Sequence, residues 1–200
     1  MSAAGGPEWV VREDAGVPVL LVLFLRRALG IREPHELPHL RGTSATPATP
    51  ATEALEQQWR TLWDMTVEPQ AHPSSVPLEL VDGFDMLVAL PAHGFDELRA
   101  AIAPHSDAAL AYARDAHERY RAHASAGSGS SYRAYASAIA EHERAVGRRA
   151  HSFELNVQVL PLAQRGVWWI GALTVAVTDG LRGDIAAFDR AIGPVIAELA

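Results

Sequence analysis

The most recognisable arrangement of chemically active residues is the pentapeptide His35-Glu36-Leu37-Pro38-His39, which satisfies the pattern HExxH. In zinc peptidases this spacing lets one helical face present both histidines to the metal, while the glutamate polarises a water molecule. Here Pro38 lies inside the motif and Pro34 just before it, and proline removes a helical hydrogen bond and adds a steric clash. The motif is therefore predicted to form a polar loop, and a metal-dependent hydrolase is only our second alternative function.

Two further histidines, His117 and His142, fall on the facing sides of two predicted helices. Imidazoles and carboxylates on adjoining helices can hold a metal ion. However, neither helix carries a Glu-x-x-His pair, and pairing the helices about their connecting loop brings His117 nearer to Ile139 than to His142. We interpret both as histidines of a helix interface, and we predict no metal or other cofactor.

The segment 179–184, Asp-Gly-Leu-Arg-Gly-Asp, joins a predicted strand to a predicted helix, which is where glycine-rich loops bind phosphate. It has only two glycines and no lysine. Asp184 would repel an anion, whereas it suits the N-cap of the following helix. We expect a structural turn followed by a capped helix.

Polar residues on one face of a predicted β-hairpin are the candidate ligand or partner surface. They are Glu154, Asn156, Gln158, Trp168 and Thr174. A sheet face with polar groups beside an aromatic ring can hold a small ligand, and Glu154 would then act as acid or base. Exposure to solvent explains the same pattern, so both interpretations stay open.

The hairpin itself is predicted from alternation. Phe153, Leu155, Val157 and Val159 point to one face, and polar residues alternate with them, which is the period of a half-buried strand. A turn at 163–166 precedes a second run rich in β-branched and aromatic residues. We predict antiparallel strands at about 152–162 and 167–178, with Phe153 opposite Val177 and Asn156 opposite Thr174.

Helical periodicity and turn signals place the other elements. An apolar helix is predicted from Val17 with Gly30 as its stop, and a buried strand is the alternative there. A helix capped by Thr52 follows. Asp82-Gly83 favours a tight hairpin turn within 78–90, with a helix through Phe84 to Leu90 as the alternative. Helices at about 106–124 and 131–149 are expected to pair as an antiparallel helical hairpin. The fold class is therefore α+β, with a small antiparallel sheet whose apolar face is covered by helices, including the Tyr132 helix and the last one.

The Ala-Thr-Pro repeat at 42–52 is typical of a semi-extended linker. We expect it to separate an N-terminal segment, 1–41, with one apolar helix from a main α+β domain, 53–200.

Composition excludes several classes of function. The chain has 200 residues with a net charge of −7, no cysteine and no lysine, so all 17 basic residues are arginines. Thiolate chemistry and the phosphate-loop lysine are excluded, and the acidic balance argues against binding to nucleic acid or anionic membranes. The longest apolar run, Val17 to Leu25, is too short to span a bilayer. We expect a cytoplasmic protein from a bacterium with a GC-rich genome.

The leading functional prediction is a non-catalytic protein-interaction or structural domain, which self-associates or binds another protein. A tryptophan-containing stripe at Leu55, Trp59, Leu62 and Trp63 and the apolar end of the hairpin favour it. The first alternative is a small-molecule-binding protein or enzyme that uses the polar hairpin face. We favour a protein without catalytic activity, because no convincing catalytic constellation is present.

Overall fold

The computed structural model of the chain describes residues 8–43, 50–126 and 131–200. The fold is α+β, as predicted. The elements are, in chain order, β1 (Trp9–Asp14), α1 (Val17–Ala28), α2 (Glu53–Val67), β2 (Leu78–Leu80), β3 (Ala89–Pro91), α3 (Asp96–Ile102), the 3-10 helix η1 (Ala103–His105), α4 (Ser106–Ala126), α5 (Ser131–Val146), β4 (Phe153–Leu160), β5 (Val167–Trp169), β6 (Thr174–Thr178), α6 (Asp179–Arg182) and α7 (Ile185–Leu199).

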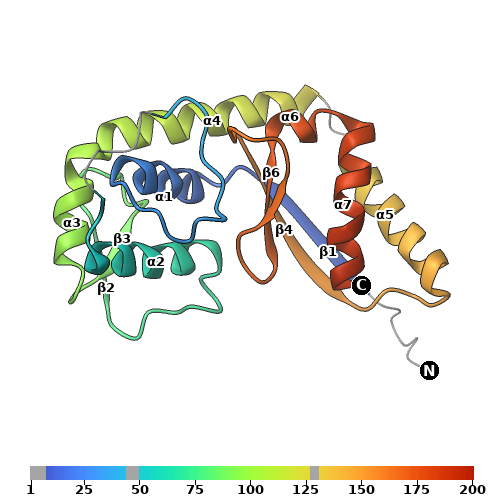
Figure 1. Cartoon of the computed structure of the whole chain (residues 1–200), viewed down its shortest axis with the longest axis horizontal. Coiled ribbons are helices and arrows are strands. Elements are labelled where there is room, and N and C mark those ends of the chain that lie inside the picture. The colour runs from blue at the N-terminus through green and yellow to red at the C-terminus, as the bar shows by residue number, and fades with distance from the viewer. Residues whose placement is uncertain (1–7, 44–49, 127–130) are drawn as a thin grey trace.

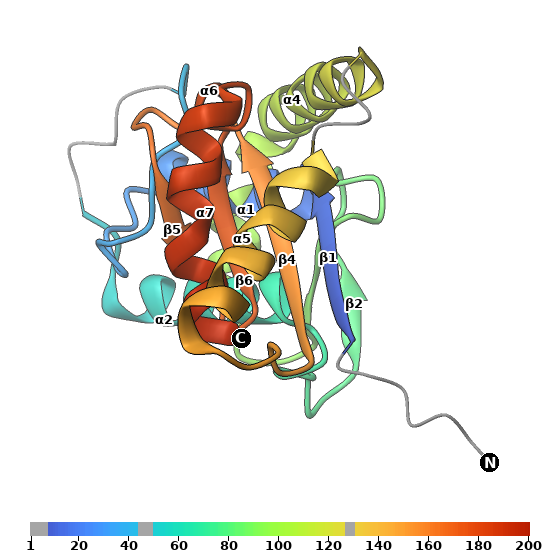
Figure 2. The ribbon, with the colours of Figure 1, turned by 90° about the vertical axis from the view of Figure 1, so that its right-hand side faces the viewer.

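The main sheet lies between two groups of helices (Figure 1). In the described part of the chain it has four strands in the order β1-β4-β6-β5. Helices α5 and α7 lie over one face, as Figure 2 shows, and α1 and α2 lie on the other side. The long helix α4 passes along the end of the sheet at which β4 and β6 finish.

The direction of the second predicted strand was wrong. β6 runs parallel to β4, and β1 is also parallel to β4, so the sheet is mixed rather than antiparallel. Asn156 does pair with Thr174, but Val177 pairs with Val159 in place of Phe153. The segment 167–178 is two strands, because the chain reverses between Trp169 and Thr174 and β5 pairs with β6 in an antiparallel hairpin.

The position of β6 explains why alternation misled the prediction. All five residues of β6 are buried, as is typical of a strand that is covered on both faces by helices. Its register therefore cannot be read from a polar and an apolar side. The reversal before β6 is held by α2, since the Leu173 N–H donates to Glu68 Oε1 at 2.8 Å.

The apolar face of β4 is confirmed. Phe153, Leu155, Val157 and Val159 are buried in one core cluster with the inner faces of α5 and α7. A second cluster, on the opposite side of the sheet, joins α1, α2, α3 and α4 to Leu160 and to Ala176 of β6.

The predicted antiparallel pairing of the helices 106–124 and 131–149 was wrong, although both helices exist. The main helical partner of α4 is α1, and that of α5 is α7. The alanine stripe of α4, including Ala109 and Ala113, is buried in the cluster of α1, whereas Tyr135 and Ile139 of α5 are buried in the cluster of α7. Each helix buries more apolar surface against a leucine- or isoleucine-rich partner than against another alanine-rich helix.

The division of the chain at 42–52 stays a prediction, and residues 44–49 of that stretch lie outside the described residues. The N-terminal segment contributes β1 to the main sheet and α1 to the core beside α2. No helix in the described ranges is long and apolar enough to cross a bilayer.

The antiparallel pairing predicted within 78–90 is confirmed, with Leu78 of β2 opposite Pro91 of β3, but the tight turn at Asp82-Gly83 is wrong, because the connection runs over residues 81–88. Gly83 adopts a φ of +82°, a conformation in which a side chain would be strained.

Arg26, a buried residue of α1, organises the loop that follows this helix. Its guanidinium donates to the carbonyl oxygens of Leu37, Arg32 and Pro34 at 2.9, 2.8 and 2.6 Å. It also lies 6.0 Å from the centre of the Trp59 ring. One buried side chain therefore holds three carbonyl groups of the loop backbone.

We predict that Arg26→Met lowers the free energy of unfolding by about 2–4 kcal/mol, because three carbonyl groups lose a charged donor inside the protein. Chemical denaturation followed by circular dichroism measures the change. Arg32→Met removes an exposed arginine from the same loop and is the matched control, expected to change stability by less than about 0.5 kcal/mol. Equal effects of the two substitutions would contradict this role of Arg26.

Candidate functional site

A cavity of about 640 Å³ lies at the edge of the sheet where the parallel strands β1, β4 and β6 end. α4 forms one wall, and α6 with the start of α7 forms another; these helices lie together at the top of Figure 1. In open sheets, ligands bind in the crevice outside the carboxyl ends of parallel strands. The volume lies within the roughly 300–1,000 Å³ of small-molecule sites.

We call this cavity the carboxyl-edge cavity, and a largely buried ion pair lines it. Arg182 Nε of α6 donates to Glu13 Oε2 of β1 at 2.8 Å, and the two side chains are only 11% and 15% exposed. The Tyr135 hydroxyl of α5 donates to the same oxygen at 2.7 Å. The guanidinium lies 4.6 Å from the ring centre of Phe188 in α7. Because removing one partner of a buried pair is costly, these contacts hold four elements at fixed positions.

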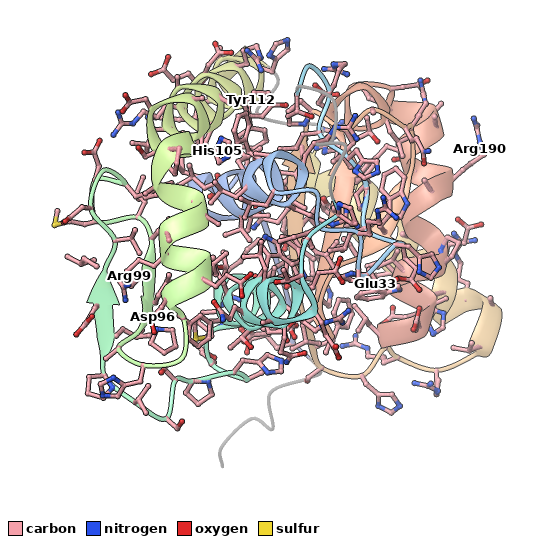
Figure 3. The ribbon with its side chains drawn as sticks, turned by 60° about the vertical axis from the view of Figure 1, so that its left-hand side comes forward. Glu33, Asp96, Arg99, His105, Tyr112 and Arg190 are labelled. Carbon is pink, nitrogen blue, oxygen red and sulfur yellow. The ribbon has the colours of Figure 1, made fainter. Side chains whose placement is uncertain are left out.

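A second ion pair lines the cavity nearer to solvent. The two terminal nitrogens of Arg41 donate to the two carboxylate oxygens of Asp179 at 3.3 and 2.7 Å, which is the bidentate geometry that arginine favours. The Tyr112 hydroxyl, which projects from α4 in Figure 3, donates to the Arg41 carbonyl oxygen at 2.7 Å. The loop after α1 is thereby joined to both α4 and α6.

Thr178, the last residue of β6, positions Asp179. Its buried hydroxyl donates to the Gln164 carbonyl oxygen at 2.6 Å and accepts from the Gly166 N–H at 3.0 Å. The chain before β5 is thus attached to the end of β6, where α6 begins.

The turn predicted at 179–184 and its cap are confirmed. Asp184 accepts from the Ala187 N–H at 3.1 Å as the N-cap of α7, and it pairs with Arg165 at 2.7 Å. The hydrogen bond from the Ala187 N–H, followed by that from Arg165, lowers the pKa of the Asp184 carboxyl. Asp184 therefore stabilises the helix start and is not a free base.

The wall formed by α4 presents Arg119, Tyr120 and His123 to the cavity. His123 Nδ1 lies 2.7 Å from the Arg119 carbonyl oxygen. Since a carbonyl can only accept, Nδ1 carries the proton and Nε2 is the ring nitrogen left for other contacts. The Arg119 guanidinium pairs with Asp115, one turn earlier in α4.

Burial keeps the tyrosine hydroxyls around the cavity protonated. It raises the pKa of Tyr120 to about 12, with a further contribution from the negative charge of Glu13. Burial likewise raises the pKa of Tyr112 to about 12, and that of Tyr135 rises for the same reason, again with help from Glu13. These hydroxyls are hydrogen-bond donors at neutral pH.

The five residues predicted as a ligand surface on the polar hairpin face lie outside the lining of the carboxyl-edge cavity. Glu154 forms an exposed ion pair with Arg12 of β1 at 2.7 Å. Gln158 Oε1 accepts from the Gly16 N–H at 2.8 Å and so joins the end of β4 to the start of α1.

Of the other three, Asn156 and Thr174 are brought together as strand partners. Thr174 is buried and its Oγ1 has no hydrogen-bond partner, while Trp168 is partly buried against the cluster that contains α1 and α2. None of the five predicted residues is among those that line the carboxyl-edge cavity. Their role in binding stays a prediction.

The HExxH residues lie in a non-helical loop, as predicted. His35 is exposed between Glu33 and Glu36, with nitrogen-to-oxygen distances of 3.6 and 3.5 Å. Burial, followed by the positive charges of Arg26 and its neighbour, lowers the pKa of His39.

The helix histidines are separated. His117 Nδ1 lies 2.7 Å from the Ala15 carbonyl oxygen, whereas His142 Nε2 is buried without a hydrogen-bond partner. Their helices, α4 and α5, pack against different helices. Within residues 8–43, 50–126 and 131–200, no three histidine, aspartate or glutamate side chains are grouped so that they could hold a metal ion.

The residues of the carboxyl-edge cavity were missed because they come from distant segments. Glu13 and Arg182 are 169 positions apart, and Arg41 and Asp179 are 138 apart. One local signal was present: Asp179 directly follows a strand, where binding residues of parallel sheets gather. This signal was not used, because the strand before Asp179 was predicted to be antiparallel to its neighbour.

A scan against protein-family models and searches of curated proteins and of solved structures found no match to this chain.

The raised tyrosine pKa values predict loss of stability at alkaline pH. Their neutral forms are favoured by folding, so this contribution is present below the unfolded pKa of about 10 and is lost as the pH rises through the folded values near 12. Absorbance at 295 nm at about pH 11 should show far less ionisation in native than in guanidinium-unfolded protein.

Tyr135→Phe provides the control for this measurement. It should remove about a quarter of the signal of the unfolded chain, which has four tyrosines, and leave the native signal unchanged. A clear fall in the native signal would mean that the Tyr135 hydroxyl ionises in the folded protein.

Proposed function

We propose that this protein binds a small molecule in the carboxyl-edge cavity. The observation that carries the proposal is a cavity of small-molecule size at the carboxyl ends of three parallel strands, into which ionisable groups from separate segments converge. The proposal keeps the class of our first alternative and moves its site away from the polar face of β4.

The lining combines the two kinds of surface that a ligand site needs. Val159, Pro161 and Ile185 supply apolar contact, and Tyr120 supplies an aromatic ring with a hydroxyl donor. The polar groups are held in place before any ligand arrives, since the acids of the lining are already paired with arginines. A pre-organised site loses less free energy to ordering when it binds.

We propose binding and not a reaction. The described lining contains no serine, threonine, cysteine or lysine, so the usual side-chain nucleophiles are lacking there. Its acids are engaged by arginines, and Asp179 also accepts from the Gly180 N–H at 2.7 Å.

A thermal-shift screen with a small-molecule panel, followed by calorimetry of each hit, tests this function. Ala124→Trp places a bulky ring in the α4 wall and should weaken binding about tenfold or more, since one lost set of contacts of about 1.4 kcal/mol has that effect. Ala122→Trp, at an exposed position outside the lining of the same helix, is the matched control. If neither substitution changes the affinity of a hit, that compound binds outside the carboxyl-edge cavity.

Self-association is the second candidate function. The surface that favours it is the exposed strand β2 and not the tryptophan-containing stripe that the sequence indicated. Trp59 and Trp63 are buried, and Trp59 Nε1 donates to the Val22 carbonyl oxygen at 3.1 Å, so they belong to the core. In contrast, Leu78 and Leu80 of β2 are 51% and 54% exposed. Exposed leucines on a strand edge are a template for pairing with another chain.

The sequence of β2 suits a second copy of this chain. In a two-fold antiparallel pair centred on Glu79, Leu78 of one copy would lie beside Leu80 of the other, which is a self-complementary contact. Glu79 is itself paired at 3.4 Å with Arg99, which projects from α3 towards this ribbon (Figure 3). The pairing would therefore not bring two unneutralised carboxylates together.

Light scattering over a concentration series tests this second function. We expect the mass to rise above the 21.5 kDa of one chain and the double substitution Leu78→Ser/Leu80→Ser to abolish the rise. Leu173→Ser/Val146→Ser removes exposed apolar side chains at other sites and should leave association unchanged. A wild-type protein that stays at the mass of one chain would rule the function out.

A further inference from the structure

We infer that the ligand of the carboxyl-edge cavity is an organic anion, with a carboxylate or phosphate group held by Arg119 and a body that lies against the apolar residues of the lining. This inference rests on the proposed small-molecule function and adds the chemical class of the ligand. Three observations support it: the net charge of the lining, the hydrogen bonds that already engage its carboxylates, and the apolar residues that it contains.

The charge of the cavity is opposite in sign to that of the protein. The whole chain carries −7, yet the described lining has three arginines, Arg41, Arg119 and Arg182, against two acids, Glu13 and Asp179. Three positive charges less two negative ones leave +1. A net excess of one sign of charge in a cleft raises the local concentration of ligands of the opposite sign.

The acids of the lining are not available to hold a cation. Glu13 Oε2 accepts from both Arg182 and Tyr135. Asp179 accepts from Arg41 through both oxygens and from the Gly180 N–H. A cationic ligand would have to displace these donors, whereas an anion leaves both pairs intact.

Arg119 is the arginine whose acidic partner is outside the lining. Asp115 lies one helical turn away and is largely exposed, so solvent weakens this pair. An anion in the cavity would compete with Asp115 for the guanidinium.

The apolar residues of the lining define the remainder of the ligand. Val159 and Pro161 lie at the end of β4, and Ile185 starts α7, while Ala116 belongs to the α4 wall. A cavity that combines these apolar residues with charged groups suits an amphipathic molecule with one anionic end. The volume of about 640 Å³ exceeds what an inorganic anion would fill.

Matched pairs of probes test the inference by calorimetry at low ionic strength. Each pair shares one body and differs in charge: aryl and alkyl carboxylates against their primary amides, and phosphate monoesters, including a nucleoside monophosphate, against the parent alcohols. Inorganic phosphate is tested alone. We expect the anionic member to bind more tightly in every pair that binds, and added salt to weaken it.

Arg119→Met should weaken the anions about tenfold or more and leave the neutral members unchanged, since one charged hydrogen bond has that effect. Arg121→Met removes an exposed arginine of α4 outside the lining and should change neither. The carboxylate and phosphate ester series also identify the anionic group of the ligand, which is the one whose series binds more tightly. If inorganic phosphate binds as tightly as its esters, the inference of an amphipathic ligand is overturned.

Failure of this inference is distinguishable from failure of the proposed function. If neutral members bind as tightly as anions, and Ala124→Trp weakens them while Arg119→Met does not, the cavity binds small molecules but the anionic class is wrong. If no probe binds at millimolar concentration, or if binding ignores Ala124→Trp, both proposals are overturned.

Discussion

The buried ion pair between Glu13 and Arg182 is the constraint on which the rest of the structure depends. Glu13 is near the end of the first strand and Arg182 is in the short helix that follows the last strand. Two charges removed from water are tolerated only when they are paired and further hydrogen-bonded, as the Tyr135 hydroxyl does here. β1 and β6 must therefore end at the same edge of the sheet, with α5 beside them.

That constraint also explains where the cavity lies. The two core clusters occupy opposite faces of one sheet, and Tyr120 of α4 packs against both of them. Beyond the ends of the strands, residues of α4 and α6 line the carboxyl-edge cavity. Glu13 near the end of β1 and Asp179 directly after β6 meet the apolar end of β4 there, so the carboxyl-edge cavity has both charged and apolar lining.

The carboxyl-edge cavity differs from the rest of the protein in its net charge. Arginine is the chain's only strong base, and its planar guanidinium favours paired contact with carboxylates and phosphates. Arg41 and Arg182 use that geometry within the protein, on Asp179 and Glu13, and so hold loop, strand and helix together. Arg119 is held by a solvent-exposed partner only one turn away, which leaves the α4 wall as the place where a ligand can gain a charged contact.

The sequence by itself determined the features that arise from neighbouring residues. The alternation from Phe153 established the buried face of β4, and Thr52 and Asp184 marked two helix starts that they do cap. Only the tertiary structure decided that β6 runs parallel to β4, that α4 packs on α1, and that Glu13 meets Arg182. Alternation and periodicity describe which side of an element is apolar, but they do not specify which distant element covers it or in which direction it runs.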